Sequence, residues 1–288
     1  MSQACSAAEI LAALYVRLLR LESPGEPQDP LPFVGTPPKA RGDHASGARF
    51  HGRTAPERDR FILSPSQYAL PLYATLVEVG RMTEAGFDSF NRDGSTVEMI
   101  GAQHSPGHEL MSGSLGQGLS QAGGIAYARR ERGEPGRVWI FMSDGELQSG
   151  QTWEALQTFA HQRLGNLTIV IDVNGQQCDG RTADVMQLEP IHERIQAFGA
   201  SVTRLDGHDV LALERETRDP PADRPRVIVA DTDPCRGLPL LRARAPRLHY
   251  LRFSHDQERR QWMEALEQLG ASIQRAARRE VDEKGGQP

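Results

Sequence analysis

The sequence VWIFMSDGELQSGQTWEALQTFAHQRLGNLTIVIDVNGQ, residues 138–176, contains two apolar, β-branched runs separated by a segment whose large apolar residues have helical spacing. The runs are Val138–Met142 and Leu167–Ile171, and the helical segment extends from Gly150 to Ala160. Strand, helix and strand of these lengths predict one βαβ unit with a right-handed crossover. The predicted fold class is therefore α/β, a doubly wound, mostly parallel sheet flanked by helices.

Polar residues follow each of the two predicted strands. Ser143-Asp144-Gly145-Glu146 comes directly after the first strand, and Asn174-Gly175-Gln176 comes shortly after the second. Parallel strands of a βαβ unit end at the same edge of the sheet, where open α/β sheets bind ligands, so we expect Asp144 and Asn174 to lie side by side. A carboxylate, an amide oxygen and a nearby backbone carbonyl are hard oxygen ligands, which suit a Mg²⁺ ion that also holds a diphosphate.

Both dipeptides also have a purely structural interpretation. Asp144-Gly145 is a common turn sequence, and Asn174-Gly175 is the commonest hairpin dipeptide. The preceding strands, however, are almost continuously apolar, which suits buried parallel strands. Residues 176–180 also offer no convincing partner strand for a hairpin. The pattern therefore favours ligand binding at the strand ends.

Five blocks of the sequence, in order, resemble the transketolase branch of the thiamine-diphosphate enzymes. The matching segments are residues 6–15, similar to the family's first helix, residues 112–119, similar to its TGSLGQGL loop, residues 143–155, similar to GDGELQEGQxWEA, residues 172–180, similar to DxNGxQxDG, and residues 198–209, similar to AFG…DGHD. Asp-Gly followed some thirty residues later by Asn would be weak alone, but the resemblance covers most of residues 6–270.

The resemblance implies a site for thiamine diphosphate and Mg²⁺. Asp144 and Asn174 would ligate the metal through their side chains, and Gln176 through its backbone carbonyl. Gly145 would let the backbone approach the diphosphate. Residues 114–118 would form a wall against the cofactor rings, with Leu115 and Gly116 in contact, although a tightly packed helix is the alternative there. The implied cofactor-binding residues are Ser114, Leu115, Gly116, Asp144, Gly145, Glu146, Asn174, Gln176 and His249.

The same resemblance indicates substrate-binding residues, but the sequence matches the family less well at those positions. His249 aligns with the histidine of the family's Trp-His dipeptide, although a surface histidine in a basic stretch is the alternative. His249 and His104 are the candidate catalytic histidines, and Gln67 and His104 are the candidate substrate residues. Gln67 stands where the family has a histidine, Ser149 replaces the glutamate of LQEG, and the Gly-His-Pro block has no clean counterpart. We therefore expect a preserved cofactor site with rewritten sugar recognition, which redirects substrate choice.

The length of 288 residues and a hydrophobic content of 38% allow one substantial core. We predict a single thiamine-diphosphate-binding domain over residues 1–288, with a Pro/Gly-rich surface loop at about 23–58 and an amphipathic, largely solvated helix at about 255–280. Ser6 and Glu9 form an S-x-x-E pattern that predicts the start of the first helix. A full-length transketolase is more than twice as long. The resemblance therefore implies a separate C-terminal transketolase-type subunit with the activating glutamate, in an α2β2 heterotetramer, and a chain that is inactive alone.

The net charge of −5 argues against a general nucleic-acid or membrane binder. Three scattered cysteines, no apolar run of transmembrane length and no signal peptide predict a cytoplasmic protein. The predicted activity is transfer of a two-carbon ketol or acyl unit from a ketose or α-keto donor to a small-molecule or carrier-bound acceptor, in a specialised biosynthetic pathway. The alternatives are an α-keto-acid dehydrogenase-type α subunit that passes an acyl unit to a carrier protein, and a non-catalytic scaffold subunit. A nicotinamide-binding Rossmann domain is disfavoured because no Gly-x-Gly-x-x-Gly follows the first strand.

Overall fold

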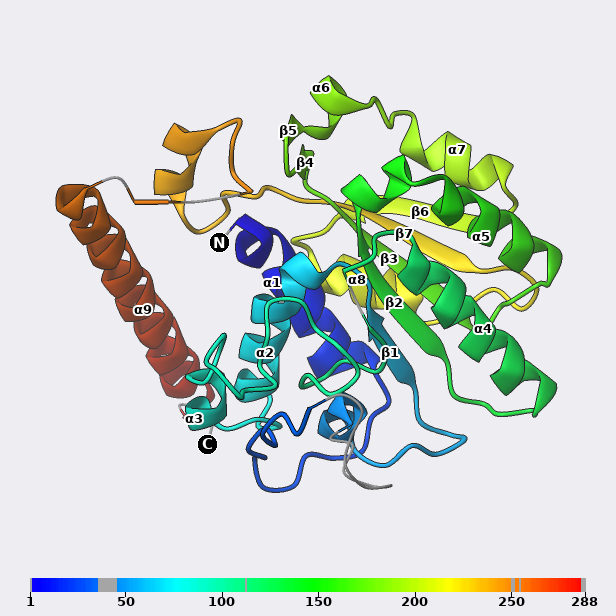
Figure 1. Ribbon diagram of the computed structural model, residues 1–288, viewed down its shortest axis with the longest axis horizontal. Coiled ribbons are helices and arrows are strands. Elements are labelled where there is room, and N and C mark those ends of the chain that lie inside the picture. The colour runs from blue at the N-terminus through cyan, green and yellow to red at the C-terminus, as the bar shows by residue number, and fades with distance from the viewer. Residues whose placement is uncertain (1, 36–45, 112, 250–251, 254, 286–288) are drawn as a thin grey trace.

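A five-stranded parallel sheet forms the centre of the computed structural model, which describes residues 2–35, 46–111, 113–249, 252–253 and 255–285, with side chains described as far as residue 276 (Figure 1). The strands are β1 (Arg60–Leu63), β2 (Val138–Ser143), β3 (Leu167–Val173), β6 (Ser201–Asp206) and β7 (Arg226–Asp231). Their order across the sheet is β1-β2-β3-β7-β6, and every neighbouring pair is parallel. The predicted α/β class with a mostly parallel sheet is confirmed.

Helices cover both faces of the sheet because successive side chains on each strand point to opposite faces. On β2, Trp139 and Phe141 face one layer, and Ile140 and Met142 face the other. The helices of the first layer are α1 (Ser2–Ala13), α2 (Ala69–Glu78) and α8 (Val210–Thr217), and those of the second are α4 (Gln117–Glu131), α5 (Gly150–His161) and α7 (Ile191–Ala197) (Figure 1). The sheet is therefore buried on both sides, as its apolar strands require.

Short elements connect these layers. They are the π-helical turn η1 (Leu14–Leu18), the 3₁₀ turns η2 (Gly47–His51), η3 (Ser66–Tyr68), η4 (Asp144–Gln148) and η5 (Pro239–Arg244), the short helices α3 (Glu84–Phe87) and α6 (Thr182–Val185), and the strands β4 (Gln176–Gln177) and β5 (Gly180–Arg181). The β4 and β5 strands pair antiparallel, so a small hairpin does follow Gly175, contrary to the sequence analysis. Its turn is Cys178-Asp179, and Asn174 lies outside it.

The sequence pattern predicts that the first helix starts at Ser6, and this prediction is wrong. Helix α1 already includes Ser2, and Ser6 is 0% exposed in its interior. The Ser6 hydroxyl donates a hydrogen bond to Asp172 Oδ2 at 2.6 Å. The Glu9 carboxylate lies 3.0 Å from His208 Nδ1 instead of returning to the helix terminus. The capping pattern fails because both side chains have partners in distant parts of the chain.

The segment predicted as a surface loop at about 23–58 is described at residues 23–35 and 46–58, and residues 36–45 lie outside the described residues. Most of the described part is irregular, but η2 packs into the body and buries Phe50 and His51. His51 lies between the Tyr15 hydroxyl, at 2.8 Å, and the Glu109 carboxylate, at 3.1 Å. This end of the segment is therefore anchored in the core.

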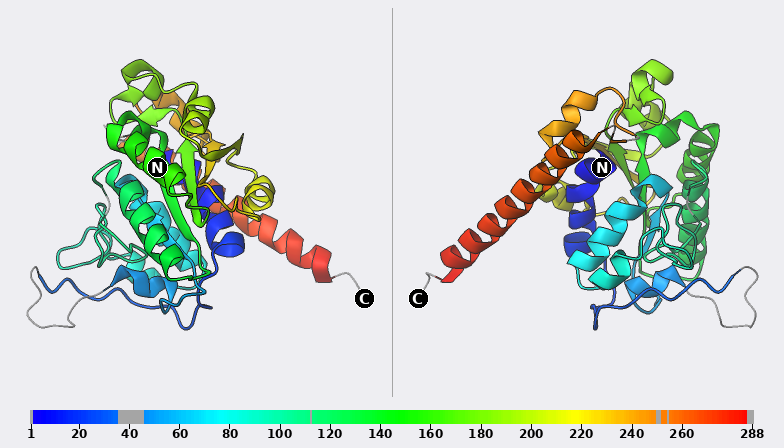
Figure 2. Two further views of the ribbon diagram at one scale, coloured as in Figure 1. Left: turned by 90° about the vertical axis from the view of Figure 1, so that its right-hand side faces the viewer. Right: turned by 60° about the vertical axis from the view of Figure 1, so that its left-hand side comes forward.

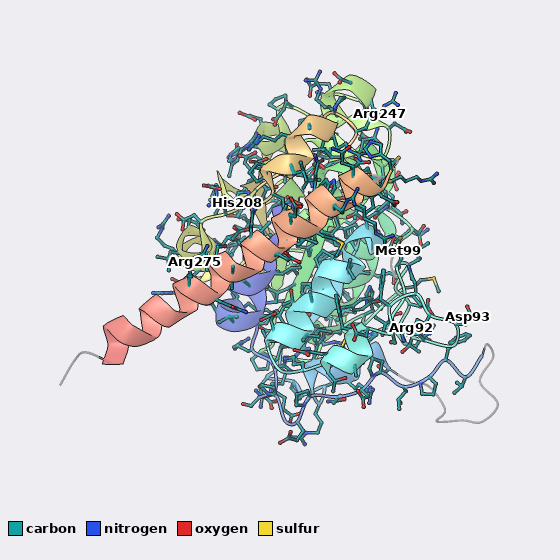
Figure 3. The ribbon with its side chains drawn as sticks, turned by 90° about the vertical axis from the view of Figure 1, so that its left-hand side faces the viewer. Arg92, Asp93, Met99, His208, Arg247 and Arg275 are labelled. Carbon is teal, nitrogen blue, oxygen red and sulfur yellow. The ribbon has the colours of Figure 1, made fainter. Side chains whose placement is uncertain are left out.

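The C-terminal helix α9 (Asp256–Gly285) projects from the body of the protein (Figure 2). Its first turns are held by Trp262, which is 3% exposed and packs with Leu238, Leu241 and Leu248. Figure 3 shows the helix leaving the body beyond this contact, with Arg275 on the projecting part. Residues 271–276 of the helix are exposed. Among the described helices, none combines the length and apolar character that crossing a bilayer requires.

Candidate functional site

A cavity of about 110 Å³ opens where β2 and β3 end. Six of the residues predicted for the site line it: Gln67, Leu115, Gly145, Asn174, Gln176 and His249. They come from η3, from the loop before α4, from the two strand ends and from the segment before α9. The ends of the parallel strands therefore collect residues from both halves of the chain, as the topology predicts.

Asp144 lies directly beside the loop that carries Asn174. Its side chain is 1% exposed, and Oδ2 accepts a hydrogen bond from the Gly175 backbone N–H at 2.9 Å. Its other carboxylate oxygen, Oδ1, is buried and has no hydrogen-bond partner among the described residues. Burial, together with the nearby negative charge of Asp172, raises the pKa of Asp144 to about 8. A buried carboxylate with an unused oxygen is a position that a cation would stabilise.

The Asn174 carboxamide has one defined orientation. Oδ1 accepts a hydrogen bond from the Gln176 backbone N–H at 2.9 Å. On the other side, Nδ2 donates to the Tyr68 hydroxyl at 2.8 Å and to Asp172 Oδ2 at 3.1 Å. Because a carbonyl oxygen has two lone pairs, Oδ1 keeps one for a further partner.

These donors fit a magnesium ion. Asp144 supplies one unused carboxylate oxygen and Asn174 one amide oxygen, which are the hard ligands that Mg²⁺ prefers. The described residues contain no group of three or more His, Cys, Asp or Glu side chains that could hold a metal. A site with a single carboxylate leaves coordination positions for phosphate oxygens and water, which is the usual arrangement for Mg²⁺.

The glycine-rich loop before α4 is tied to the end of β2 by Glu146. This carboxylate is fully buried and accepts hydrogen bonds from the Gly116 N–H, at 3.1 Å, and from the Ser64 hydroxyl. Burial raises the pKa of Glu146. Gly116 has φ +85°, and a Cβ there would lie 2.7 Å from Ser149 Oγ, so the loop requires glycine. Glu146 thus holds the loop from beneath, while Leu115 reaches the cavity.

The two candidate histidines have different positions. His249 lines the cavity, and its Nδ1 lies 3.2 Å from Gln3 Nε2. Partial burial lowers the pKa of His249, which favours the neutral ring. His104 is not among the cavity residues. Its Nε2 lies 3.1 Å from Glu98 Oε1, and its ring is tilted against Phe33, with the ring centroids 5.1 Å apart. Ser114 is exposed at the surface and does not line the cavity either.

Sequence reasoning missed the contribution of α1 and of Tyr68 in η3. Ser2, Gln3 and Tyr68 line the cavity, and the Ser2 hydroxyl donates to the Leu248 carbonyl at 2.9 Å. Ser6 lies beneath Asn174, with Oγ 3.3 Å from Nδ2. The resemblance of residues 6–15 to a family helix was the available signal, but it did not indicate which side of the helix faces the site.

The sequences of known proteins support the same interpretation of the site. Residues 50–245 match the family described as transketolase, thiamine diphosphate binding domain. The chain is 39% identical over 223 residues to an uncharacterised transketolase family protein of Sinorhizobium fredii, with 75% of this chain and 77% of that protein covered. It is 32% identical to an apulose-4-phosphate transketolase subunit of Actinobacillus succinogenes, with 68% and 71% covered. It is also 32% identical to a 6-deoxy-6-sulfo-D-fructose transketolase subunit of Clostridium sp., with 81% and 76% covered.

Solved structures show the same fold. Transketolase from Leishmania mexicana superposes with a TM-score of 0.59 at 20% identity, with 94% of this chain and 46% of that enzyme covered. Transketolase from Pichia stipitis gives a TM-score of 0.60 at 22% identity, with 80% and 35% covered. This chain thus spans less than half of those two enzymes, whereas it spans about three quarters of the related subunits. The chain belongs to the transketolase family and carries that family's thiamine diphosphate binding domain.

Proposed function

We propose that this chain is the diphosphate- and Mg²⁺-binding subunit of a two-subunit transketolase that transfers a two-carbon ketol unit from a ketose to an acceptor. The observation that carries this function is the junction of two strand ends. The unused Asp144 oxygen lies beside the loop in which Asn174 presents an oriented amide oxygen. The Gln176 backbone carbonyl, at the same loop, is the third proposed ligand.

A second subunit is part of this proposal. The cavity of about 110 Å³ is smaller than the roughly 300–1,000 Å³ of a typical small-molecule site, which supports a site completed by a second chain. Two relatives of similar length are themselves named as transketolase subunits. The missing wall is a C-terminal transketolase-type subunit with the activating glutamate, and the assembly is an α2β2 heterotetramer, which light scattering of the co-purified subunits tests.

The residues of this chain bind and orient the reactants. Asp144, Asn174 and Gln176 would hold the metal and, through it, the diphosphate. When bound, thiamine diphosphate would supply the carbanion chemistry that two-carbon transfer requires. Leu115 limits the cavity on the side of the glycine-rich loop. The neutral His249 ring, held by Gln3, can exchange a proton or a hydrogen bond with a substrate hydroxyl.

The proposed donor class is supported by one cavity residue, for recognition of hydroxyl groups, and by the related subunits, for the negative charge. Gln67 places an uncharged amide there, in the position at which the family has a histidine, and an amide can both donate to and accept from sugar hydroxyls. The related subunits are named for apulose 4-phosphate and 6-deoxy-6-sulfo-D-fructose, each of which is an anionic sugar. An anionic ketose outside ordinary pentose phosphate exchange is therefore the proposed donor.

Cofactor binding is the first test. Calorimetric titration of the co-purified subunits with thiamine diphosphate should show Mg²⁺-dependent binding that Asp144→Asn weakens at least tenfold. The matched control is Asp184→Asn, which changes a surface carboxylate that pairs with Arg181. Equal binding by the two variants would contradict the proposed site. The absence of any binding by the wild-type assembly would instead favour the scaffold alternative.

Product analysis is the second test and separates the two enzymatic alternatives. An anionic ketose donor should give a shortened aldose together with a two-carbon-extended acceptor, without release of carbon dioxide. Stoichiometric carbon dioxide from an α-keto acid, with acyl transfer to a carrier protein, would identify the dehydrogenase-type alternative. Loss of product with Asp144→Asn, and not with Asp184→Asn, links the activity to this chain.

A further inference from the structure

A second buried carboxylate, Asp172, lies behind the proposed metal ligands. It is the sixth residue of β3 and is 0% exposed. Its side chain points to the layer of α1 and α2, where it meets Ser6 and Tyr68. No hydrogen bond joins it to Asp144 in the described residues, and it does not line the cavity. Its contacts are therefore with neighbours of the site.

Three donors converge on one oxygen of Asp172. Oδ2 accepts from the Ser6 hydroxyl at 2.6 Å, from the Tyr68 hydroxyl at 2.6 Å and from Asn174 Nδ2 at 3.1 Å. Oδ1, on the other side of the carboxyl group, accepts from the Thr232 hydroxyl. A carboxylate can accept at both oxygens, and such charge-assisted hydrogen bonds are stronger than neutral ones.

These hydrogen bonds determine which end of the Asn174 amide faces the cavity. Because Ser6 and Tyr68 give their hydroxyl hydrogens to Asp172, their lone pairs face Nδ2 of Asn174, at 3.3 and 2.8 Å. Three acceptors therefore surround Nδ2. If the amide turned over, Oδ1 would meet those acceptors and Nδ2 would meet the Gln176 N–H. Both contacts would then be repulsive.

We propose that Asp172 is a positioning residue, which sets the hydroxyls of Ser6 and Tyr68 and thereby keeps the Asn174 amide oxygen directed at the metal. Because Asp172 acts through Asn174, its role rests on the proposed function. Groups that orient metal ligands from behind typically contribute about 10- to 100-fold to metal affinity. The same range applies here, since without Asp172 the amide is free to present its NH₂ group to the cation.

The experiment measures Mn²⁺ binding by electron paramagnetic resonance of the free ion, with the full-length chain, thiamine diphosphate and the C-terminal partner all present. We expect Asp172→Ala to weaken Mn²⁺ binding about 10- to 100-fold. Asp172→Asn should recover most of the loss, because its amide oxygen can occupy the Oδ2 position while its NH₂ group faces the Thr232 hydroxyl. Should Asp172→Ala fail to fold, Tyr68→Phe, which removes one acceptor of Nδ2, should still weaken binding about 2- to 10-fold.

Thr232→Val is the matched control, because it removes a hydrogen bond to Asp172 on the side away from Asn174. It should change Mn²⁺ affinity less than twofold, even where it lowers the urea midpoint of the metal-free protein. Unchanged Mn²⁺ affinity in folded Asp172→Ala would overturn the positioning role, as would an equal loss in Thr232→Val. If the wild-type assembly fails to bind Mn²⁺ at all, the proposed function is itself wrong.

Discussion

Two adjacent glycines in α4 allow the packing between α4 and α5 to be measured. A Cβ on Gly123 would lie 2.0 Å from two ring carbons of Phe159 in α5, whereas a Cβ on Gly124 would meet nothing within 4 Å. Phe159 is 6% exposed, packs within the core and lines a cleft of about 500 Å³ between α4 and α5, so a methyl group at Gly123 must displace its ring. Both glycines therefore lie in the same helix, but only Gly123 faces another side chain at close range.

Alanine at either position gains about 1 kcal/mol of helix propensity over glycine. At Gly123 the added methyl group also overpacks the core, which typically costs about 1–3 kcal/mol. We therefore expect Gly124→Ala to raise the free energy of unfolding by up to about 1 kcal/mol, and Gly123→Ala to lower it by about 0–2 kcal/mol. The difference between the variants isolates the contact with Phe159.

Urea unfolding followed by circular dichroism measures both values on the full chain, provided that the m-values agree. In a Phe159→Leu background, where the ring is absent, Gly123→Ala should lower the free energy of unfolding by less than it does in the wild type. If Gly123→Ala is as stable as Gly124→Ala, to within about 0.5 kcal/mol, and shows no coupling to Phe159→Leu, the close packing is refuted.

Two further perturbations address other parts of the molecule. Burial lowers the pKa of His108 to about 4, against 6.5 when unfolded, so between these pH values the unfolded chain binds more protons and stability falls as the pH falls. Between pH 7 and pH 5, the free energy of unfolding of the wild type should fall by about 2 kcal/mol more than that of His108→Leu. Equal decreases in the two proteins, measured by urea unfolding, would contradict the burial of His108. Trp262→Ala should release α9 from the body and speed proteolysis near residue 256, whereas Met263→Ala, at a 55% exposed neighbour, should not.

The main features of the site follow from local patterns in the sequence. Apolar runs identify β2 and β3, and parallel strands must end at one edge, so the meeting of Asp144 with the Asn174 loop is predictable. Periodicity also identifies the helix between them, because Ala155, Leu156 and Phe159 repeat at helical spacing and are buried. These features are determined by residues close together in the sequence, so a local sequence pattern can predict them.

The remaining features depend on contacts between distant residues. Ser6 has the pattern of a helix cap, yet its partner Asp172 lies 166 residues further along the chain. Nothing near Gln3 indicates that it meets His249, 246 residues away. His104 has the residue type expected of a catalytic group, but its ring packs against Phe33, 71 residues before it. In each case a tertiary partner decides the role, and local propensity carries no information about that partner.

The cluster around Asp172 has a consequence for how the protein matures. Its members belong to the first helix, η3, β3 and the end of β7, and the Ser6 and Thr232 contacts span 166 and 60 residues of chain. Contacts of such long range form late in folding, because each must close a large loop. A nascent chain still lacking Thr232 therefore has an incomplete cluster. Because Ser6, Asp172 and Asn174 come together only when the first helix packs onto β3, the proposed metal site would form with the finished fold, and a bound cation would stabilise that fold rather than an early intermediate.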